Sequence, residues 1–205
     1  MNEMRTQEGA LGASAEPRRR PGGRTREHTE RIHAAAIDVL LAEGLPGLTF
    51  QRVATDAGVG RATMYRRWSS PAQLAVEAIR STANAQIRVH DTGSLAGDLG
   101  DLLGQIGAFI GTPVGRAAVA AGLQIIPTDE PENDAPAGWA RRWEEVTVVF
   151  DRAIARGELA VSIDAEAAFA ALAGALYFRV IVMGRSVTPE WIERVLALPL
   201  TPVEG

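Results

Sequence analysis

Hydrophobic residues recur at three- and four-residue intervals along most of the chain, which is the period of amphipathic α-helices. The pattern is sharpest within residues 49–68, where two short segments flank the sequence Gly-Val-Gly. In the first segment, the apolar positions i, i+3, i+4 and i+7 are Phe50, Val53, Ala54 and Ala57. Thr49 is a suitable N-cap, and Gly58 suits the left-handed residue that ends many helices. A short helix, a glycine turn and a second helix predict a helix-turn-helix.

Similar periodicity predicts further helices on both sides of this pair. They are expected over residues 25–43, 70–90, 94–111, 112–126, 139–156, 164–183 and 188–198. No segment shows a convincing two-residue alternation of the kind found in β-strands. The predicted fold is therefore all-α, with about nine helices: a three-helix head, a connecting fourth helix and a helical body. The helix expected from residue 94 contains Gly100, Gly104, Gly107 and Gly111, which indicates either close helix packing or an adaptable helix.

The chain divides by composition into three parts. Residues 1–24 contain almost no large apolar side chain, so we expect a disordered tail there. The head is expected over residues 25–86 and the body over residues 87–205. The tail contains Arg18, Arg19, Arg20 and Arg24. These arginines leave two interpretations open, an arm that follows DNA phosphates or enters a minor groove, and a tail that only aids solubility.

The second helix of the pair, residues 60–68, carries the clearest candidate binding surface. With about 100° of rotation per residue, its side chains separate into two faces and a border. One face contains Arg61, Ala62, Tyr65 and Arg66, the core side contains Met64 and Trp68, and the border contains Thr63 and Arg67. A flat cationic face suits base edges in a DNA major groove, and border residues suit the flanking phosphates. Taken alone, the segment is also compatible with an ordinary solvated surface.

Charge and composition narrow the function classes. The net charge is −4, but residues 1–70 contain 11 arginines against 8 acidic residues, whereas residues 71–205 contain 10 against 17. Positive charge is thus concentrated beside the helix-turn-helix, as expected if the acidic body faces away from DNA. The absence of cysteine excludes disulfides, thiolate metal sites and cysteine catalysis. His28 and His33 have no partners at metal-ligand spacing and are expected at the surface or its edge. We find no phosphate-binding loop or Ser-His-Asp set, so we expect no cofactor, no metal and no enzyme activity.

The most apolar stretch, residues 167–183, allows either a buried helix or a membrane span. Its alanine content and the interruption by Arg179 favour a buried helix. Residues 1–24 lack the apolar core of a signal peptide, so we expect a cytoplasmic protein with no membrane span. A helix that is apolar almost all round must be covered on every side. A homodimer formed through the helices expected over residues 164–183 and 188–198 satisfies that requirement.

An effector site is expected among the body helices. The candidate residues are the body's larger aromatic side chains, one methionine and one arginine: Phe109, Trp139, Trp143, Phe150, Tyr177, Phe178, Arg179 and Met183. For each aromatic residue, a place in the hydrophobic core is the alternative to a place in a binding site. Arg179 must be compensated within its apolar surroundings. It could pair with a dimer partner, bind an anionic ligand or reach solvent.

The chain resembles the TetR family of bacterial transcriptional regulators over about residues 26–86. The resemblance rests on the segments IHAAAIDVLLAEG, LTFQRVATDAGV, RATMYRRW and SSPAQL. The C-terminal segment GALYFRVIVMGRSVTPEWIERV resembles one common type of ligand-binding domain in that family. The resemblance implies a homodimeric repressor that binds a near-palindromic operator and is released by a small-molecule effector. Alternatives are an architectural or nonspecific DNA-binding protein and an enzyme with a helical body.

The resemblance also implies particular DNA contacts. By position they are Thr49, Arg52, Gly60, Arg61, Ala62, Thr63, Tyr65, Arg66 and Arg67. Thr49, Arg52, Thr63 and Arg67 would contact phosphates, and the face containing Tyr65 would approach the bases. Two positions depart from the family pattern. Arg67 stands where the family often has His and retains the charge, whereas Pro71 stands where the family commonly has a phosphate-binding Lys.

Overall fold

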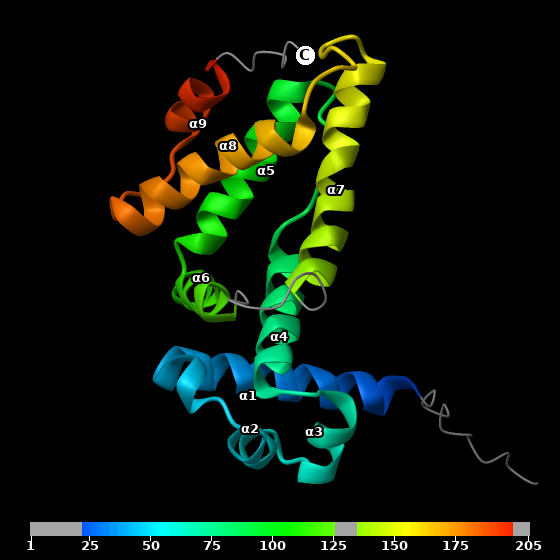
Figure 1. Ribbon diagram of the computed structural model, residues 1–205, viewed down its shortest axis with the longest axis vertical. Coiled ribbons are helices and arrows are strands. Elements are labelled where there is room, and N and C mark those ends of the chain that lie inside the picture. The colour runs from blue at the N-terminus through cyan, green and yellow to red at the C-terminus, as the bar shows by residue number, and fades with distance from the viewer. Residues whose placement is uncertain (1–21, 126–134, 199–205) are drawn as a thin grey trace, which may run out of the picture.

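The computed structural model describes residues 22–125 and 135–198, with side chains described for residues 25–124 and 143–198 (Figure 1). Every regular element within these ranges is helical, which confirms the predicted all-α fold. The described elements are α1 Gly22–Gly47, α2 Phe50–Ala57, α3 Arg61–Arg67, α4 Pro71–Gln86, α5 Leu95–Ile110, α6 Pro113–Ile125, α7 Ala135–Ala155, α8 Ala165–Tyr177, the π-helical turn η1 Phe178–Val182, and α9 Pro189–Leu196.

Buried apolar side chains form two clusters at opposite ends of the molecule. The head cluster joins α1, α2, α3 and the first half of α4 around Ile32, Val53, Met64, Trp68 and Leu74. The body cluster joins α5, α7, α8 and α9 around Leu99, Leu102, Phe150, Leu172 and Leu176. Each part therefore has its own core, and α4 connects them (Figure 1).

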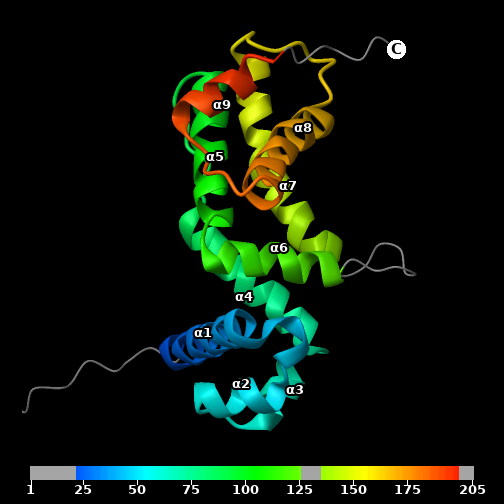
Figure 2. The same cartoon turned by 90° about the vertical axis from the view of Figure 1, so that its left-hand side faces the viewer.

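Helix α6 lies at the junction between the head and the body, where it contacts both α1 and α4 (Figure 2). It leaves α5 at an angle of 87° through the turn at Thr112. A Cβ atom at Gly115 would lie 2.0 Å from the carbonyl oxygen of Phe109, so this close turn requires glycine. A sharp, tightly packed turn thus places α6 between the two parts of the molecule.

The predicted starts of α2 and α4 are confirmed by their caps. The hydroxyl of Thr49 accepts a hydrogen bond from the amide of Arg52 at 3.2 Å. The hydroxyl of Ser70 accepts from the amide of Gln73 at 3.1 Å, with Pro71 at the first position of α4. Gly58 adopts φ 63°, the left-handed conformation expected at the end of α2. These interactions fix both ends of α2 and the start of α4.

Two predicted helix starts differ from the structure. Helix α1 begins at Gly22 rather than at residue 25, and its helical backbone is interrupted at Gly44, where φ is 70°, directly after the predicted helix end at residue 43. Helix α7 begins at Ala135 rather than at residue 139. Its second residue is Pro136, which the first turn of a helix accommodates because no amide is needed there. The remainder of the predicted tail, residues 1–21, lies outside the described residues.

The prediction that the fourth helix extends to residue 90 is wrong, because α4 ends at Gln86. The side-chain amide of Gln105 replaces the missing helical hydrogen bonds. Its oxygen accepts from the amide of Arg88 at 2.7 Å, and its nitrogen donates to the carbonyl oxygen of Arg88 at 3.0 Å. Ile87 is buried with an extended backbone, φ −111° and ψ 121°. The chain therefore leaves the helix in order to pair with α5.

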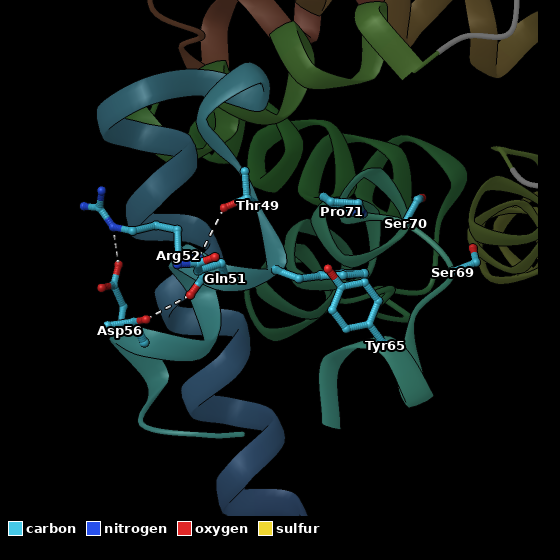
Figure 3. Close-up of a pocket in the computed structure, with 10 residues that line it drawn as sticks. Thr49, Gln51, Arg52, Asp56, Tyr65, Ser69, Ser70 and Pro71 are labelled. Atoms are coloured by element: carbon cyan, nitrogen blue, oxygen red, sulfur yellow. Dashed lines mark hydrogen bonds and ion pairs between the residues drawn. The ribbon is translucent and has the colours of Figure 1, made fainter. Parts of the chain in front are cut away.

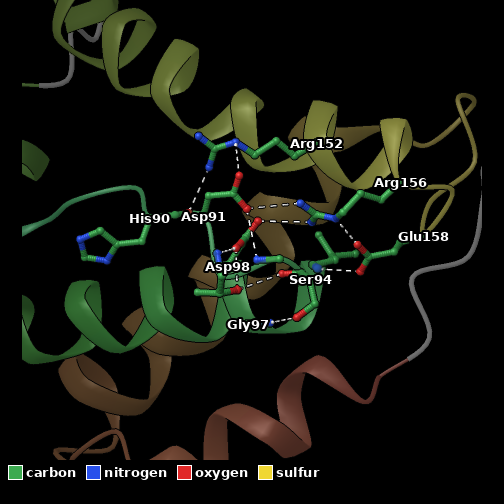
Figure 4. Close-up of polar contacts among 11 residues, drawn as sticks. His90, Asp91, Ser94, Gly97, Asp98, Arg152, Arg156 and Glu158 are labelled. Atoms are coloured by element: carbon green, nitrogen blue, oxygen red, sulfur yellow. Dashed lines mark hydrogen bonds and ion pairs between the residues drawn. The ribbon is translucent and has the colours of Figure 1, made fainter.

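The rest of this linker is held by charged side chains from α5 and α7 (Figure 4). Asp98, which is 1% exposed, accepts from the amide and the hydroxyl of Thr92, each at 2.6 Å. Arg156 donates to the other oxygen of Asp98 at 3.3 Å. Arg152 donates to the carbonyl oxygen of His90 at 3.1 Å. The C-terminal end of α4 is consequently anchored to the body on two sides.

Glycines on α5 allow close packing with the C-terminal segment, one of the two alternatives raised by the sequence. A Cβ atom at Gly107 would lie 2.8 Å from a side-chain carbon of Val187, a distance that neighbouring atoms would have to relieve. At Gly104, the nearest atom is a methyl of Ile192 at 3.6 Å, an ordinary contact. Close approach therefore requires glycine at Gly107 but not at Gly104.

Candidate nucleic-acid interface

The exposed face of α3 has the composition predicted from its sequence. Met64 is completely buried in the head core, and Trp68, which caps the helix, is 2% exposed. The opposite side presents Arg61, Ala62, Tyr65 and Arg66 to solvent. We call these four residues the recognition face. Thr63 is half-buried beside it, and Arg67 is exposed.

Tyr65 projects from the recognition face and is held there by α2. Its side chain is 68% exposed. Its ring meets the ring of Phe50 edge to face, with centroids 5.0 Å apart and planes at 82°. Phe50 is only 5% exposed, so it supplies a fixed surface from the head core. This contact restricts the orientations of Tyr65 without burying the phenol.

A surface hollow lies beside Tyr65, where the starts of α2 and α4 approach each other (Figure 3). It is lined by Thr49, Phe50, Gln51, Arg52, Thr55, Asp56, Tyr65, Ser69, Ser70 and Pro71. The first turn of a helix presents unpaired amides and a partial positive charge, which favour an anion. The hollow is therefore suited to a phosphate of a DNA backbone that passes the recognition face.

Arg61 and Arg67 already have partners within the head. Arg61 donates to the side-chain oxygen of Gln51 at 3.0 Å, which links α3 to α2. Arg67 donates to the hydroxyl of Thr29 at 2.7 Å, which links α3 to α1. The Arg67 guanidinium also lies 4.4 Å from the ring centroid of Trp68. These contacts orient both side chains along the surface that contains the recognition face.

Arg52 is paired with two carboxylates, which the sequence interpretation missed. Its Nε donates to Asp56 at 2.9 Å, and one terminal nitrogen lies 3.0 Å from Glu43 at the end of α1. The spacing of four residues between Arg52 and Asp56 was a usable signal, because side chains at i and i+4 are neighbours on a helix. The Glu43 contact depends on how α1 packs on α2 and has no comparable local signal.

Glu77 of α4 joins three head helices and was also missed. Its carboxylate accepts from the indole nitrogen of Trp68 at 2.7 Å and lies 3.2 Å from the ring nitrogen of His33. The side chain of His33 is 12% exposed, less than expected for a residue at the surface or its edge. Burial lowers the pKa of His33, and the nearby Glu77 carboxylate only partly offsets that effect.

The effector candidates occupy two different environments in the body. Phe109 and Phe150 are 6% and 1% exposed and belong to the body core. Trp143 is half-buried, with its ring centroid 6.1 Å from that of Phe169. Tyr177, Phe178 and Met183 instead lie on the outside, 41%, 57% and 45% exposed. The side chain of Trp139 lies outside the described residues.

Arg179 is half-buried and has two contacts within its own chain. Its Nε donates to the carbonyl oxygen of Ser186 at 2.7 Å, and its guanidinium lies 4.8 Å from the ring centroid of Trp191. The charge is therefore compensated by the chain's own turn and by α9. The turn follows η1, in which the amide of Met183 donates to the carbonyl oxygen of Phe178.

The outer face of α8 and η1 remains uncovered within one chain. Residues Ala165–Val182 are long and apolar enough to cross a membrane by length and composition alone, and 22% of that stretch is buried. Within the single chain the stretch is therefore only partly buried, and its coverage by a second copy stays a prediction. The more hydrophobic end of the exposed stretch lies toward η1, where Ile181 and Val182 are 38% and 68% exposed. Exposed apolar surfaces of this kind are typical of protein–protein interfaces.

Comparison with known proteins places the chain in a family. Residues 32–78 match "Bacterial regulatory proteins, tetR family", and residues 89–198, more than half of the chain, match "Tetracyclin repressor-like, C-terminal domain". The HTH-type transcriptional regulator AqdR of Rhodococcus erythropolis is 28% identical over 174 residues, covering 84% of this chain and 83% of AqdR.

Solved structures agree with these matches. The TetR family transcription regulator SCO0332 superposes with a TM-score of 0.65 at 25% identity, covering 83% of this chain and 94% of that one. FadR of Bacillus subtilis, solved with stearoyl-CoA, has the same fold, with a TM-score of 0.61 at 14% identity and coverage of 85% and 98%. The helix-turn-helix head, the helical body and these matches together show that the chain belongs to the TetR family and is a DNA-binding transcriptional regulator.

Proposed function

We propose that the protein is a cytoplasmic, homodimeric repressor that binds a near-palindromic operator and leaves it when a small molecule binds the body. The observation that carries this proposal is the recognition face, an exposed cationic surface on a short helix whose opposite side is fully buried. Two such heads related by a two-fold axis can contact major-groove half-sites about 34–36 Å apart. No catalytic role is needed to account for these features.

The contacts divide into base contacts and phosphate contacts. We assign base edges to the recognition face, because bidentate donors such as Arg61 and Arg66 suit guanine in the major groove. We assign phosphates to Thr49, Arg52, Thr63 and Arg67, with Gly60 allowing the backbone to approach closely. Pro71 provides no amide or charge, so the hollow beside it is the proposed substitute for the family's lysine contact.

The dimer is proposed to form through α8 and α9, with η1 extending the α8 contribution. The exposed apolar side chains of α8 and η1 support this assignment. In α9, Ile192 and Val195 are 7% exposed and face the chain's own body core, whereas Leu198 beyond its end is 60% exposed. The main apolar contribution is therefore expected from α8 and η1.

The effector is proposed to enter among the body helices and to act through α4. Helix α6 supports this route, because it touches both α1 and α4 at the base of the body. FadR, which has the same fold, has been solved in complex with stearoyl-CoA, and this supports a ligand-binding role for the protein. A difference of about 1–3 kcal/mol in effector affinity between two head positions suffices for a 5–150-fold response.

The DNA contacts are tested by operator mapping on genomic DNA, followed by two matched substitutions. Tyr65→Ala should reduce the preference for the operator over random DNA, because it removes a side chain from the recognition face. Arg67→Ala should weaken binding to both DNAs and reduce the salt dependence by about one phosphate. The affinities are measured by fluorescence anisotropy at several salt concentrations.

Two results would contradict the proposal. Equal affinity for mapped and random DNA in the parent protein would favour a nonspecific DNA-binding protein. If both substitutions reduced only the preference for the operator, the division into base and phosphate contacts would be wrong. A subsequent screen for small molecules that release the operator tests the effector separately.

A further inference from the structure

The hollow that suits a phosphate contains a negatively charged side chain. Asp56 lines it together with Arg52 and Thr49, on the side formed by α2 (Figure 3). An acidic group that lines a surface apposed to DNA repels the phosphate backbone. The Asp56 carboxylate therefore opposes the phosphate contacts that contribute most of the affinity for DNA.

Asp56 and Glu43 both form ion pairs with Arg52. One guanidinium is shared between Asp56 at 2.9 Å and Glu43 at 3.0 Å, so the three side chains together carry a net charge of −1. All three are accessible, with 51% of the Arg52 side chain exposed and 43% and 38% of the Glu43 and Asp56 side chains. Both carboxylates can therefore compete with a DNA phosphate for the same guanidinium.

We propose that Glu43 and Asp56 restrain Arg52 and thereby limit the sequence-independent affinity of the head for DNA. Arg52 must exchange carboxylate partners for a phosphate before it contributes to binding. The carboxylates also repel the approaching backbone. Affinity for nonspecific DNA comes almost entirely from phosphate contacts. The restraint therefore lowers mainly the affinity for the many nonspecific sites of a genome, which compete with the operator for the protein.

This inference rests on the proposed phosphate contact of Arg52, and the experiment separates the two. Affinity for a random-sequence duplex is measured against salt concentration for the parent, Asp56→Asn, Arg52→Gln and the double variant. Asp56→Asn should bind about two- to fivefold more tightly, the range expected for one exposed charge interaction. The slope of log affinity against log salt should steepen by up to about one.

The double variant provides the decisive comparison. Arg52→Gln should weaken binding more in the Asp56→Asn background than in the parent, because only the released arginine reaches a phosphate fully. Asp56→Glu, which keeps the charge and the pairing, should remain within about twofold of the parent. Asp151→Asn, on the exposed surface of α7, makes the same change in net charge far from the head and is the matched control.

Each other outcome identifies which statement is wrong. If Arg52→Gln leaves affinity unchanged in both backgrounds, the phosphate contact of Arg52 is refuted. If Arg52→Gln weakens binding equally in both backgrounds, or if Asp56→Asn weakens binding, the restraint is refuted while the contact stands. If Asp151→Asn tightens binding as much as Asp56→Asn, the effect reflects overall charge and the restraint is again refuted.

Discussion

The head and the body carry their functional residues in opposite ways. In the head, the core is made by one side of each short helix, and the recognition face lies entirely outside it. In the body, the aromatic effector candidates are divided between the core, which contains Phe109 and Phe150, and an outer face, which contains Tyr177 and Phe178. The candidate binding residues thus differ in type from the core residues in the head, whereas in the body the two sets have the same residue types.

This difference explains why the sequence predicts a distinct candidate surface in the head but not in the body. The exposed, cationic helix face is not needed for the head core, so its side chains are available to a partner. An aromatic residue at helical spacing stabilises a core whether or not it also contacts a ligand. Residue type therefore predicts a candidate DNA-binding surface in the head but does not single out a candidate effector site in the body.

The largest expected effect tests whether Phe150 belongs to the core. Phe150→Ala should lower the free energy of unfolding of the body by about 3–5 kcal/mol, because a fully buried ring leaves a cavity. Tyr177→Ala, on the outer face, should change it by less than about 1 kcal/mol when measured on monomer. Urea denaturation followed by circular dichroism measures both. A loss below 1 kcal/mol for Phe150→Ala would place that ring beside an open space instead.

An intermediate effect is expected from two glycines on the same helix. Gly107→Ala should destabilise the body by about 1–3 kcal/mol, because the new methyl group meets Val187 at 2.8 Å. Gly104→Ala has ordinary contacts and should stabilise the body by about 0.5–1 kcal/mol, since alanine favours helix. Thermal unfolding compares the two variants. Equal effects would show that α5 and the C-terminal segment do not pack closely.

The smallest expected effect is a difference between the pH values at which the head and the body lose stability. Burial lowers the pKa of His33 below its ordinary value of 6.5. Its contribution to head stability is therefore present above about pH 6.5 and is lost as the pH falls through the lowered value. Burial alone would raise the pKa of Asp98, but hydrogen bonds from Thr92 and Arg156 lower it below 3.8. Its contribution to body stability is present above that pH and is lost below it.

The head should consequently begin to lose stability at a higher pH than the body. Hydrogen exchange measured at pH 7.5, 5.5 and 4.5 distinguishes the two, because it reports local opening in α1 and α5 separately. His33→Asn should reduce the pH dependence of hydrogen-exchange protection in the head. The same substitution at the exposed His28 should leave that pH dependence unchanged. Simultaneous loss of protection in both parts would show that they unfold as one unit.

The parts of the structure that sequence analysis predicted depend on neighbouring residues. Thr49, Ser70 and Gly58 act on amides within a few positions, so local sequence identifies them as helix ends. The end of α4 depends on Gln105, which is 17 residues away from the backbone that it binds. Likewise, His33 and Glu77 are 44 positions apart in the sequence, so no local sequence pattern predicts their contact.

Other misses have different physical causes. The η1 turn differs from an α-helix only in hydrogen bonds between i and i+5, and its side-chain period is too similar to be distinguished over five residues. The partners of Arg179 arise from the turn that follows, whose path is not encoded by the helix itself. The Arg52–Asp56 pair, by contrast, has helical spacing and could have been predicted from the sequence.

The anchored linker gives α4 the mechanics of a lever arm. Its C-terminal end is pinned to the body through Gln105, Asp98 and Arg152, whereas Pro71 at its other end lies in the head. With 16 residues, the arm is about 24 Å long. A rotation of about 5° around the pinned end moves the Pro71 end by about 2 Å. In a two-fold dimer, opposite swings of the two arms would alter the span between the heads by about 4 Å, roughly the rise of one base pair.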